Sequence, residues 1–349
     1  MSRTSAENAA LRPPLLLAGR HAQTMASSLP LHSRNWRHRT EKLRAEATMQ
    51  LLELDEGVRL QGQYTAGADR DKGLVVLLHG WEGGADSPYM LTLALALNDA
   101  GYATFRLNLR DHGGTHDLNE ELFHSCRITE IVEAVAALQR RYSPSHFALV
   151  GYSLGGNFAL RVGARAAAAG IELEKIIAVC PVLHPPHTMH ALETGLWAYR
   201  SYYLRKWRRS LLAKQASFPH RYRLGDLRRF KTLTATTDFF VREYTEFPNI
   251  ETYLHGYSIL GPVLEKLCVP SRVIAAADDP IIPSADLAKL PSHPNLELTV
   301  LPWGGHCGFV TSYRLASCID YIVVDELDRV TRPRMSGASP RIPGAKCRS

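Results

Sequence analysis

Residues 150–156 are Val150-Gly151-Tyr152-Ser153-Leu154-Gly155-Gly156, in which a serine stands between two glycines, each two residues away. This pattern is typical of a sharp turn from a strand into a helix, because glycines allow the close backbone approach that such a turn needs. A serine hydroxyl is a weak nucleophile until a positioned base removes its proton, and the turn makes room for that base. The stretch therefore predicts acyl-transfer chemistry at Ser153.

The flanking residues predict the strand and the helix that the turn requires. Residues 147–150 form a short apolar run after Pro144, which is typical of a buried strand. Residues 157–169 are rich in alanine and other helix formers, and Gly170 stands where a helix would end. The order strand, turn, helix is thus expected around Ser153.

The rest of the sequence predicts an α/β fold with a doubly wound, mostly parallel sheet. Apolar runs of strand length recur at residues 74–78, 103–109, 176–180, 273–277 and 296–301. Helical periodicity follows the first two of them, at residues 90–97 and 128–138. Residues 49–54 and 58–64, joined through Asp55-Glu56-Gly57, predict an antiparallel hairpin. Alternation of strands and helices favours a parallel sheet.

The alternation stops between the strands at 176–180 and 273–277. Aromatic residues mix there with arginines in a helical pattern, and we expect a lid insertion at about residues 182–267. Its place in the chain puts it above the carboxyl ends of the strands, where ligands bind in open α/β sheets. Ordinary packing helices are the alternative interpretation.

Length and composition favour one large catalytic domain. The chain has 349 residues, of which 45% are hydrophobic and 21% charged. We expect an N-terminal arm at residues 1–45, the domain at 46–328 and a disordered basic tail at 329–349. No apolar run is long enough for a bilayer, so a cytoplasmic location is expected. The six scattered cysteines predict free, buried thiols.

The net charge of +7 is concentrated in one part of the chain. Residues 200–231 contain eleven Lys or Arg and a single acidic residue, Asp226. A solvated helix surface is the simplest explanation, and nucleic-acid binding is not predicted. The aromatic residues among these charges support a hypothesis of weak contact with anionic membranes. They are Trp197, Tyr202, Tyr203 and Trp207.

An acid and a histidine follow Ser153 in the order that a Ser-Asp-His triad requires. Asp278-Asp279-Pro280 comes directly after the strand at 273–277, and His306 lies in a glycine-rich loop after the last strand. His306 is the expected base, and an aspartate orients it. We favour Asp279, because Pro280 fixes the turn beside it, and Asp278 is the alternative.

The expected oxyanion hole consists of two backbone N–H groups, from Leu154 and Trp81. Leu154 follows the nucleophile, and Trp81 lies in the loop His79-Gly80-Trp81-Glu82-Gly83-Gly84 after the first parallel strand. A histidine that precedes such a loop usually braces the turn, so we do not expect His79 to act as a second base.

Two groups of histidines were considered as metal ligands, and neither predicts a site. The first is His112 with His116. The second contains His184, His187 and His190, where two prolines interrupt the helical spacing that zinc sites use. We expect no metal and no cofactor.

Several of these segments resemble the YheT-like branch of the α/β-hydrolase superfamily. They are His21-Ala22-Gln23-Thr24, His79-Gly80-Trp81-Glu82-Gly83, Gly151-Tyr152-Ser153-Leu154-Gly155-Gly156-Asn157, Asp278-Asp279-Pro280 and Gly304-Gly305-His306-Cys307-Gly308-Phe309. The resemblance extends over roughly residues 16–325 and implies ester hydrolysis through an acyl-enzyme, without a cofactor. His112 departs from the small residue expected there, and the sequence lacks the N-terminal membrane helix of anchored relatives.

The sequence therefore predicts a serine hydrolase of carboxylic esters with short to medium or hydrophobic acyl chains. Its expected partner is a small-molecule or lipid-like ester, and the sequence does not determine the oligomeric state. Acyl transfer to another acceptor uses the same triad and is one alternative. A non-catalytic binding or scaffold module is the other.

Overall fold

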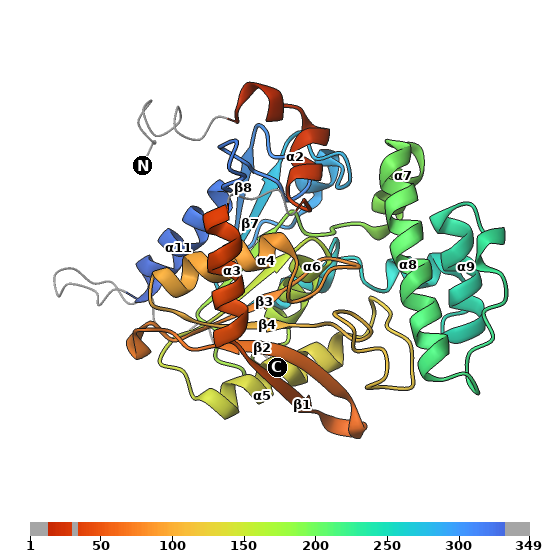
Figure 1. Cartoon of the computed structure of the whole chain (residues 1–349), viewed down its shortest axis with the longest axis horizontal. Coiled ribbons are helices and arrows are strands. Elements are labelled where there is room, and N and C mark those ends of the chain that lie inside the picture. Colours follow the sequence, from red (N-terminus) through yellow and green to blue (C-terminus); the bar gives the residue numbers. More distant parts are fainter. Residues whose placement is uncertain (1–12, 30–33, 332–349) are drawn as a thin grey trace.

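The computed structural model describes residues 13–29 and 34–331, and these residues contain one eight-stranded sheet in the order β1-β2-β4-β3-β5-β6-β7-β8 (Figure 1). The strands are β1 (Thr48–Glu53), β2 (Arg59–Thr65), β3 (Leu74–Leu78), β4 (Ala103–Leu107), β5 (Phe147–Tyr152), β6 (Lys175–Val179), β7 (Ser271–Ala276) and β8 (Leu296–Leu301). The pairs β1–β2 and β2–β4 are antiparallel, and all other neighbours are parallel. The predicted mostly parallel α/β sheet is confirmed.

Helices cover both faces of the sheet. They are α3 (Arg34–Glu46), α4 (Pro88–Asp99), α5 (Ile128–Tyr142), α6 (Leu154–Gly163) and α11 (Cys318–Thr331). Because successive strand residues point to opposite faces, Val75 and Leu77 pack with α4 and α11, whereas Leu74 and Val76 pack with α5 and α6. Both faces of β3 are buried, which explains why this strand is a continuous apolar run.

Residues 182–267 form a group of helices at one side of the sheet, which we call the helical segment (Figure 1). Its helices are α7 (Pro185–Thr194), α8 (Trp197–Ser217), α9 (Leu233–Tyr244) and α10 (Ile250–His255). The segment has a small core of its own around Leu211, Phe240 and Tyr253. That it acts as a lid stays a prediction. No helix within the described residues has the length and apolarity to cross a membrane.

The structure differs from the sequence-based expectations at three places. The helix expected at 157–169 is shorter, because α6 ends at Gly163 and the chain reaches Gly170 through turns. A Cβ at Gly163 would lie 2.5 Å from Ile176 Cδ1, so this end of α6 packs closely on β6. Of the expected tail, residues 329–331 are the end of α11, and 332–349 lie outside the described residues. Five cysteines are free, but Cys126 and Cys268 are only half-buried, and Cys347 is not described.

The first described helix, α2 (Arg20–Ala26), belongs to the packing of the domain. Gln23 and Thr24 are buried, although residues 1–45 were expected to form an arm. In α3, Leu43 joins the core on the α4 side of the sheet. Helices α2 and α3 are therefore in contact with the rest of the fold.

Candidate active site

Ser153 lies in a tight turn between β5 and α6. Its φ of 52° is rare for a residue with a side chain, so the surrounding structure holds it in a strained conformation. A Cβ on Gly151 would lie 2.2 Å from the carbonyl oxygen of Gly155. A Cβ on Gly155 would lie 2.3 Å from the carbonyl oxygen of Leu78. Both glycines of the predicted turn are thus sterically necessary.

Ser153, His306 and Asp279 form one chain of hydrogen bonds. His306 Nε2 lies 2.9 Å from Ser153 Oγ, and His306 Nδ1 lies 2.9 Å from Asp279 Oδ2. The other carboxylate oxygen of Asp279 accepts the N–H groups of Ile281 and Ile282 at 2.8 and 2.9 Å. These two bonds fix the orientation of the carboxylate toward the imidazole.

Asp278 does not contact the imidazole. Its Oδ1 accepts the N–H group of Gly305 at 2.9 Å, so it braces the backbone directly before His306. The two neighbouring carboxylates therefore hold the same loop in different ways.

The charge of Asp279 controls the protonation of His306. Burial by itself would lower the pKa of His306, but the Asp279 carboxylate, together with the neighbouring Cys307 side chain, holds this pKa well above its usual value of 6.5. A neutral imidazole accepts a proton at Nε2 only if Nδ1–H points at the carboxylate. The hydrogen bond to Asp279 selects this tautomer.

Helix α2 positions the loop that carries His306. Thr24 Oγ1 accepts the backbone N–H of His306 at 2.9 Å, and the Gln23 amide bonds both the N–H and the C=O of Val310, at 2.7 and 3.1 Å. Gly305 has a φ of 54°, and a Cβ there would lie 2.4 Å from the carbonyl oxygen of Arg20. Sequence reasoning noted this segment only through the family resemblance and assigned it no role.

The loop from His79 to Gly84 passes close to Ser153. A Cβ on Gly80 would lie 3.2 Å from Ser153 Cβ. His79 is fully buried, its Nδ1–H donates to Gly80 O at 2.7 Å and its Nε2 accepts the N–H of Leu109 at 3.1 Å. Burial lowers the pKa of His79 to about 4, so it stays neutral and braces the turn, as expected.

His112 and Lys206 hold the same loop from outside. His112 Nδ1–H donates to Arg110 O at 2.7 Å, and its Nε2 accepts the N–H of Glu82 at 3.1 Å. Lys206, from α8, donates to the carbonyl oxygen of Glu82 at 2.7 Å. The unusual residue His112 therefore supports the loop, and Lys206 connects that loop to the helical segment.

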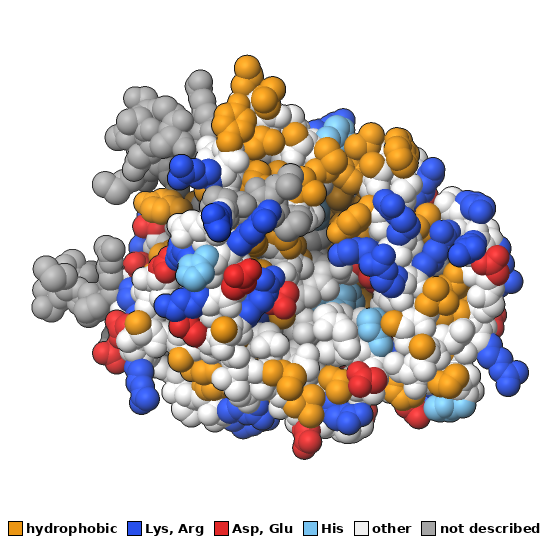
Figure 2. All heavy atoms as spheres, viewed as in Figure 1, with side chains coloured by type: hydrophobic (Ala, Val, Ile, Leu, Met, Phe, Trp, Pro, Cys, Tyr) orange, Lys and Arg blue, Asp and Glu red, His pale blue; other side chains and the backbone are white. Residues whose placement is uncertain are grey.

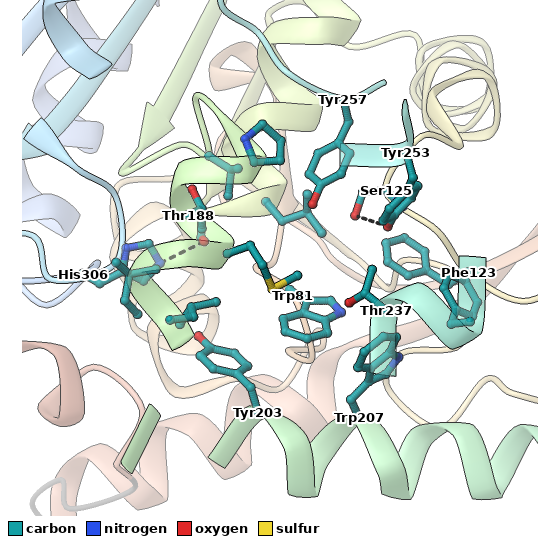
Figure 3. Close-up of a pocket in the computed structure, with 18 residues that line it drawn as sticks. Trp81, Phe123, Ser125, Thr188, Tyr203, Trp207, Thr237, Tyr253, Tyr257 and His306 are labelled. Carbon is teal, nitrogen blue, oxygen red and sulfur yellow. Dashed lines mark hydrogen bonds between the residues drawn. The ribbon is translucent and has the colours of Figure 1, made fainter. Parts of the chain in front are cut away.

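An apolar pocket opens beside Ser153 and His306 (Figure 3). The empty space inside it, including its open mouth, is about 760 Å³. Tyr203 and Trp207 point into it from α8 (Figure 3), and both pack against Trp81, with ring centroids 5.3 and 5.4 Å apart. Other apolar side chains in its wall are Phe123, Met189, Leu192, Phe240 and Tyr253.

The orientation of Tyr203 and Trp207 corrects part of the membrane hypothesis. These two side chains line the pocket, whereas Trp197 and Tyr202 are exposed.

A second hollow, with Lys206, Glu82 and Tyr202 in its wall, meets the first at Ser153 and His306. Burial raises the pKa of Glu82 to about 7. Ser153 thus stands between an apolar and a more polar space.

Two groups of side chains within the described residues have donor atoms close enough for a metal ion. One is Cys180, His306 and Cys307, and the other is His184, His187 and Asp286. His112 and His116, which the sequence did not favour as metal ligands, are not among them: His112 forms the hydrogen bonds described above, and His116 Nε2 lies 2.8 Å from Ser210 Oγ.

Comparison with known proteins identifies the family. Residues 73–313, more than half of the chain, match the sequence profile of the α/β hydrolase fold. The chain belongs to the α/β hydrolase fold family. It is 27% identical over 277 residues to the putative esterase YheT of Escherichia coli, with 75% of this chain and 78% of that protein covered. The predicted resemblance to the YheT-like branch of this α/β hydrolase family is confirmed.

Other relatives are more distant. A putative esterase of Synechocystis sp. is 24% identical over 293 residues, which cover 76% of this chain and 78% of that protein. An esterase structure from Pyrococcus furiosus superposes with a TM-score of 0.55 at 17% identity, covering 83% of this chain and 93% of that chain. The structural similarity supports the fold of this α/β hydrolase.

Proposed function

We propose that this α/β hydrolase cleaves carboxylic esters through an acyl-enzyme on Ser153. The observation that carries the proposal is the position of His306, 2.9 Å from both Ser153 Oγ and Asp279 Oδ2, at the edge of an apolar pocket. The names of the related putative esterases support the same reaction class.

In the proposed mechanism, His306 Nε2 takes the proton of Ser153 as Oγ attacks the ester carbonyl carbon. The imidazolium then gives this proton to the leaving alkoxide, and the C–O bond of the ester breaks to release the alcohol. Water, activated by His306, attacks the acyl-enzyme next and releases the acid. Asp279 stabilises the imidazolium in both halves without becoming protonated itself.

The oxyanion of each tetrahedral intermediate would be stabilised by the backbone N–H groups of Leu154 and Trp81. Leu154 is the first residue of α6, where backbone N–H groups lack intrahelical partners. Trp81 follows Gly80, where a Cβ would lie 3.2 Å from Ser153 Cβ. Support for the loop by His112 and Lys206 would keep the Trp81 amide in place without rearrangement during the reaction.

The two spaces beside Ser153 support a division between acyl group and alcohol. Aromatic and aliphatic side chains surround the larger pocket, which favours medium or hydrophobic acyl chains. The hollow with Lys206 and Glu82 is more polar and would receive the alcohol. The physiological ester is expected to be small or lipid-like.

The test is labelling with a fluorophosphonate followed by hydrolysis of nitrophenyl esters of increasing acyl length. Wild type should react, and Ser153→Ala should not be labelled. Ser153→Ala and His306→Ala should each lower kcat by up to about 10⁶-fold, to the residual rate of the oxyanion hole. Wild-type protein that neither reacts nor hydrolyses any ester would overturn the proposal in favour of a binding module.

We also propose weak, peripheral contact with anionic membranes. Trp197 is 68% exposed, Leu15 and Leu16 are 87% and 79% exposed, and Lys and Arg side chains gather over α8 (Figure 2). Apolar side chains beside basic ones bind anionic interfaces. Sedimentation with vesicles that does not depend on anionic lipid would contradict this proposal.

A further inference from the structure

Three side chains from two separated parts of the chain meet where the helical segment begins. His184 and His187 lie at the start of α7, and Asp286 lies in the short 3-10 helix Ser284–Lys289. Their donor atoms all lie within 4.8 Å of one another. His187 Nδ1 is 2.8 and 2.9 Å from the two oxygens of Asp286, and the rings of His184 and His187 are 4.1 Å apart.

The start of α7 explains why the two histidines converge although prolines separate them. His184 is the N-cap, Pro185 and Pro186 occupy the first two helical positions, and His187 is the third. Proline is well suited to the first turn of a helix, and side chains at the N-cap and the third position meet in helix caps. The prolines therefore hold the two histidines together, although they interrupt the regular helical spacing of zinc ligands.

The donor atoms of this group are available. His184 Nδ1 is buried and has no hydrogen-bond partner in the described part of the chain. Asp286 is 1% exposed, and within the described residues Lys289 is the one lysine or arginine that forms an ion pair with it, at 2.9 Å.

We propose that His184, His187 and Asp286 bind a divalent transition-metal ion of the zinc class, with water as the fourth ligand. Two imidazoles and one carboxylate form a donor set that Zn²⁺ prefers, whereas Mg²⁺ and Ca²⁺ prefer oxygen alone. Ligands at 2.0–2.1 Å from a tetrahedral ion stand about 3.3 Å apart. The 2.8 Å between His187 and Asp286 needs only a small opening to reach that spacing.

The ion would connect the pocket wall to the segment that follows Asp279. Thr188, Met189 and Leu192 of α7 line the apolar pocket, and Ile281, between Asp279 and Asp286, lines it too. A metal held by both elements would resist their separation. Its expected role is to stabilise the fold around the pocket, and this role does not depend on the proposed ester hydrolysis.

The test titrates metal-free, full-length protein with Co²⁺ and Zn²⁺. One equivalent of Co²⁺ should produce the visible bands of a four-coordinate nitrogen and oxygen site without sulfur-to-cobalt charge transfer. Zn²⁺ should displace the cobalt, and at 100 times its Kd it should raise Tm by roughly 3–10 °C. Both readouts are independent of catalytic activity.

Variants at exposed positions supply the comparison. His187→Ala should weaken metal binding by at least about 100-fold, because losing a direct ligand exceeds the effect of losing an outer-shell partner. His190→Ala, an exposed histidine on the same helix, is the matched control and should bind as wild type does. Lys289→Met should bind more tightly, because the lysine competes with the ion for Asp286.

Four results would overturn the proposal. The first is the absence of binding by wild type below 100 µM metal (about 10⁻⁴ M, the weak end of specific cation sites). The second is equal affinity in His187→Ala, and the third is a sulfur-to-cobalt charge-transfer band. This band would place the metal at Cys180, His306 and Cys307 instead. The fourth is a loss of binding in His190→Ala equal to that in His187→Ala.

Discussion

Replacing Lys214 by methionine tests how α8 is attached to the rest of the domain. The ammonium group of Lys214 is completely buried and lies 2.8 Å from Asp111 Oδ1. It also donates to the carbonyl oxygens of His116 and Asn119, at 3.3 and 2.5 Å. Methionine keeps the apolar stem but leaves the Asp111 carboxylate buried, with the N–H of Phe123 as its remaining partner.

The expected loss is large because one charge of a buried pair is left alone. Removing one partner of such a pair costs about 3–5 kcal/mol of unfolding free energy. Burial raises the pKa of Asp111, and Lys214 opposes this increase, so the pKa rises further in the variant. A carboxyl with a raised folded-state pKa destabilises the fold where it is ionised. The loss of unfolding free energy in Lys214→Met should therefore be largest above the folded-state pKa of Asp111. It should shrink as the pH falls toward the pKa of an aspartate in the unfolded chain, about 3.9.

The assay is urea unfolding at pH 8 and pH 5.5, with Asp111→Asn and the double variant completing a mutant cycle. The double variant should lose less than the sum of the single losses, because neither charge is then left unpaired. Lys231→Met, at an exposed position between α8 and α9, is the control and should change stability by less than about 0.5 kcal/mol. A loss of unfolding free energy below about 1 kcal/mol in Lys214→Met at pH 8, with no coupling to Asp111, would show that this ion pair does not attach α8 to the domain.

Three further predictions concern the candidate active site. Asp279→Asn should lower kcat/KM by about 10⁴-fold and shift the acid limb of the remaining activity to lower pH, because the carboxylate that raises the pKa of His306 is gone. Kinetics between pH 5 and 9 measure both effects. An equal loss of activity in Asp278→Asn would contradict the assignment of Asp279 as the partner of His306. Thr24→Val removes the acceptor of the His306 backbone N–H and should lower kcat about tenfold with little change in KM. This matches a hydrogen bond of about 1–1.5 kcal/mol. An unchanged kcat would show that this hydrogen bond does not position the imidazole. Trp207→Ala enlarges the apolar pocket and should move the optimum of the nitrophenyl ester series to longer acyl chains; a uniform loss at every length would argue against an acyl pocket.

Much of the fold could be predicted because buried parallel strands leave a simple pattern. β3 and β8 have the predicted bounds, since apolar runs between polar turns mark strands that are covered on both faces or paired at an edge. The positions of Ser153, Asp279 and His306 were also predictable as a group. Each follows a strand of one parallel sheet, and the carboxyl ends of such strands lie along one edge.

The remaining features depend on contacts that no local pattern encodes. α8 mixes aromatic and basic residues around its whole circumference, so the sequence did not reveal that Tyr203 and Trp207 face inward. Asp286 joins His184 and His187 only through tertiary packing, because it lies 99 positions from His187 in the chain. The choice between Asp278 and Asp279 depended on side-chain direction at the end of β7, which the strand alternation indicated only approximately.

The bond between Thr24 and His306 joins residues 282 positions apart in the chain. During synthesis, α2 leaves the ribosome long before its partner loop exists. Gln23 and Thr24, which are buried in the folded protein, stay exposed to solvent or bound by a chaperone until that loop has been synthesised. The loop with the imidazole can take its final position only when the earliest and latest parts of the domain meet. Fusions or truncations at the N-terminal side of α2 are therefore expected to affect the maturation of the site more than the formation of the sheet.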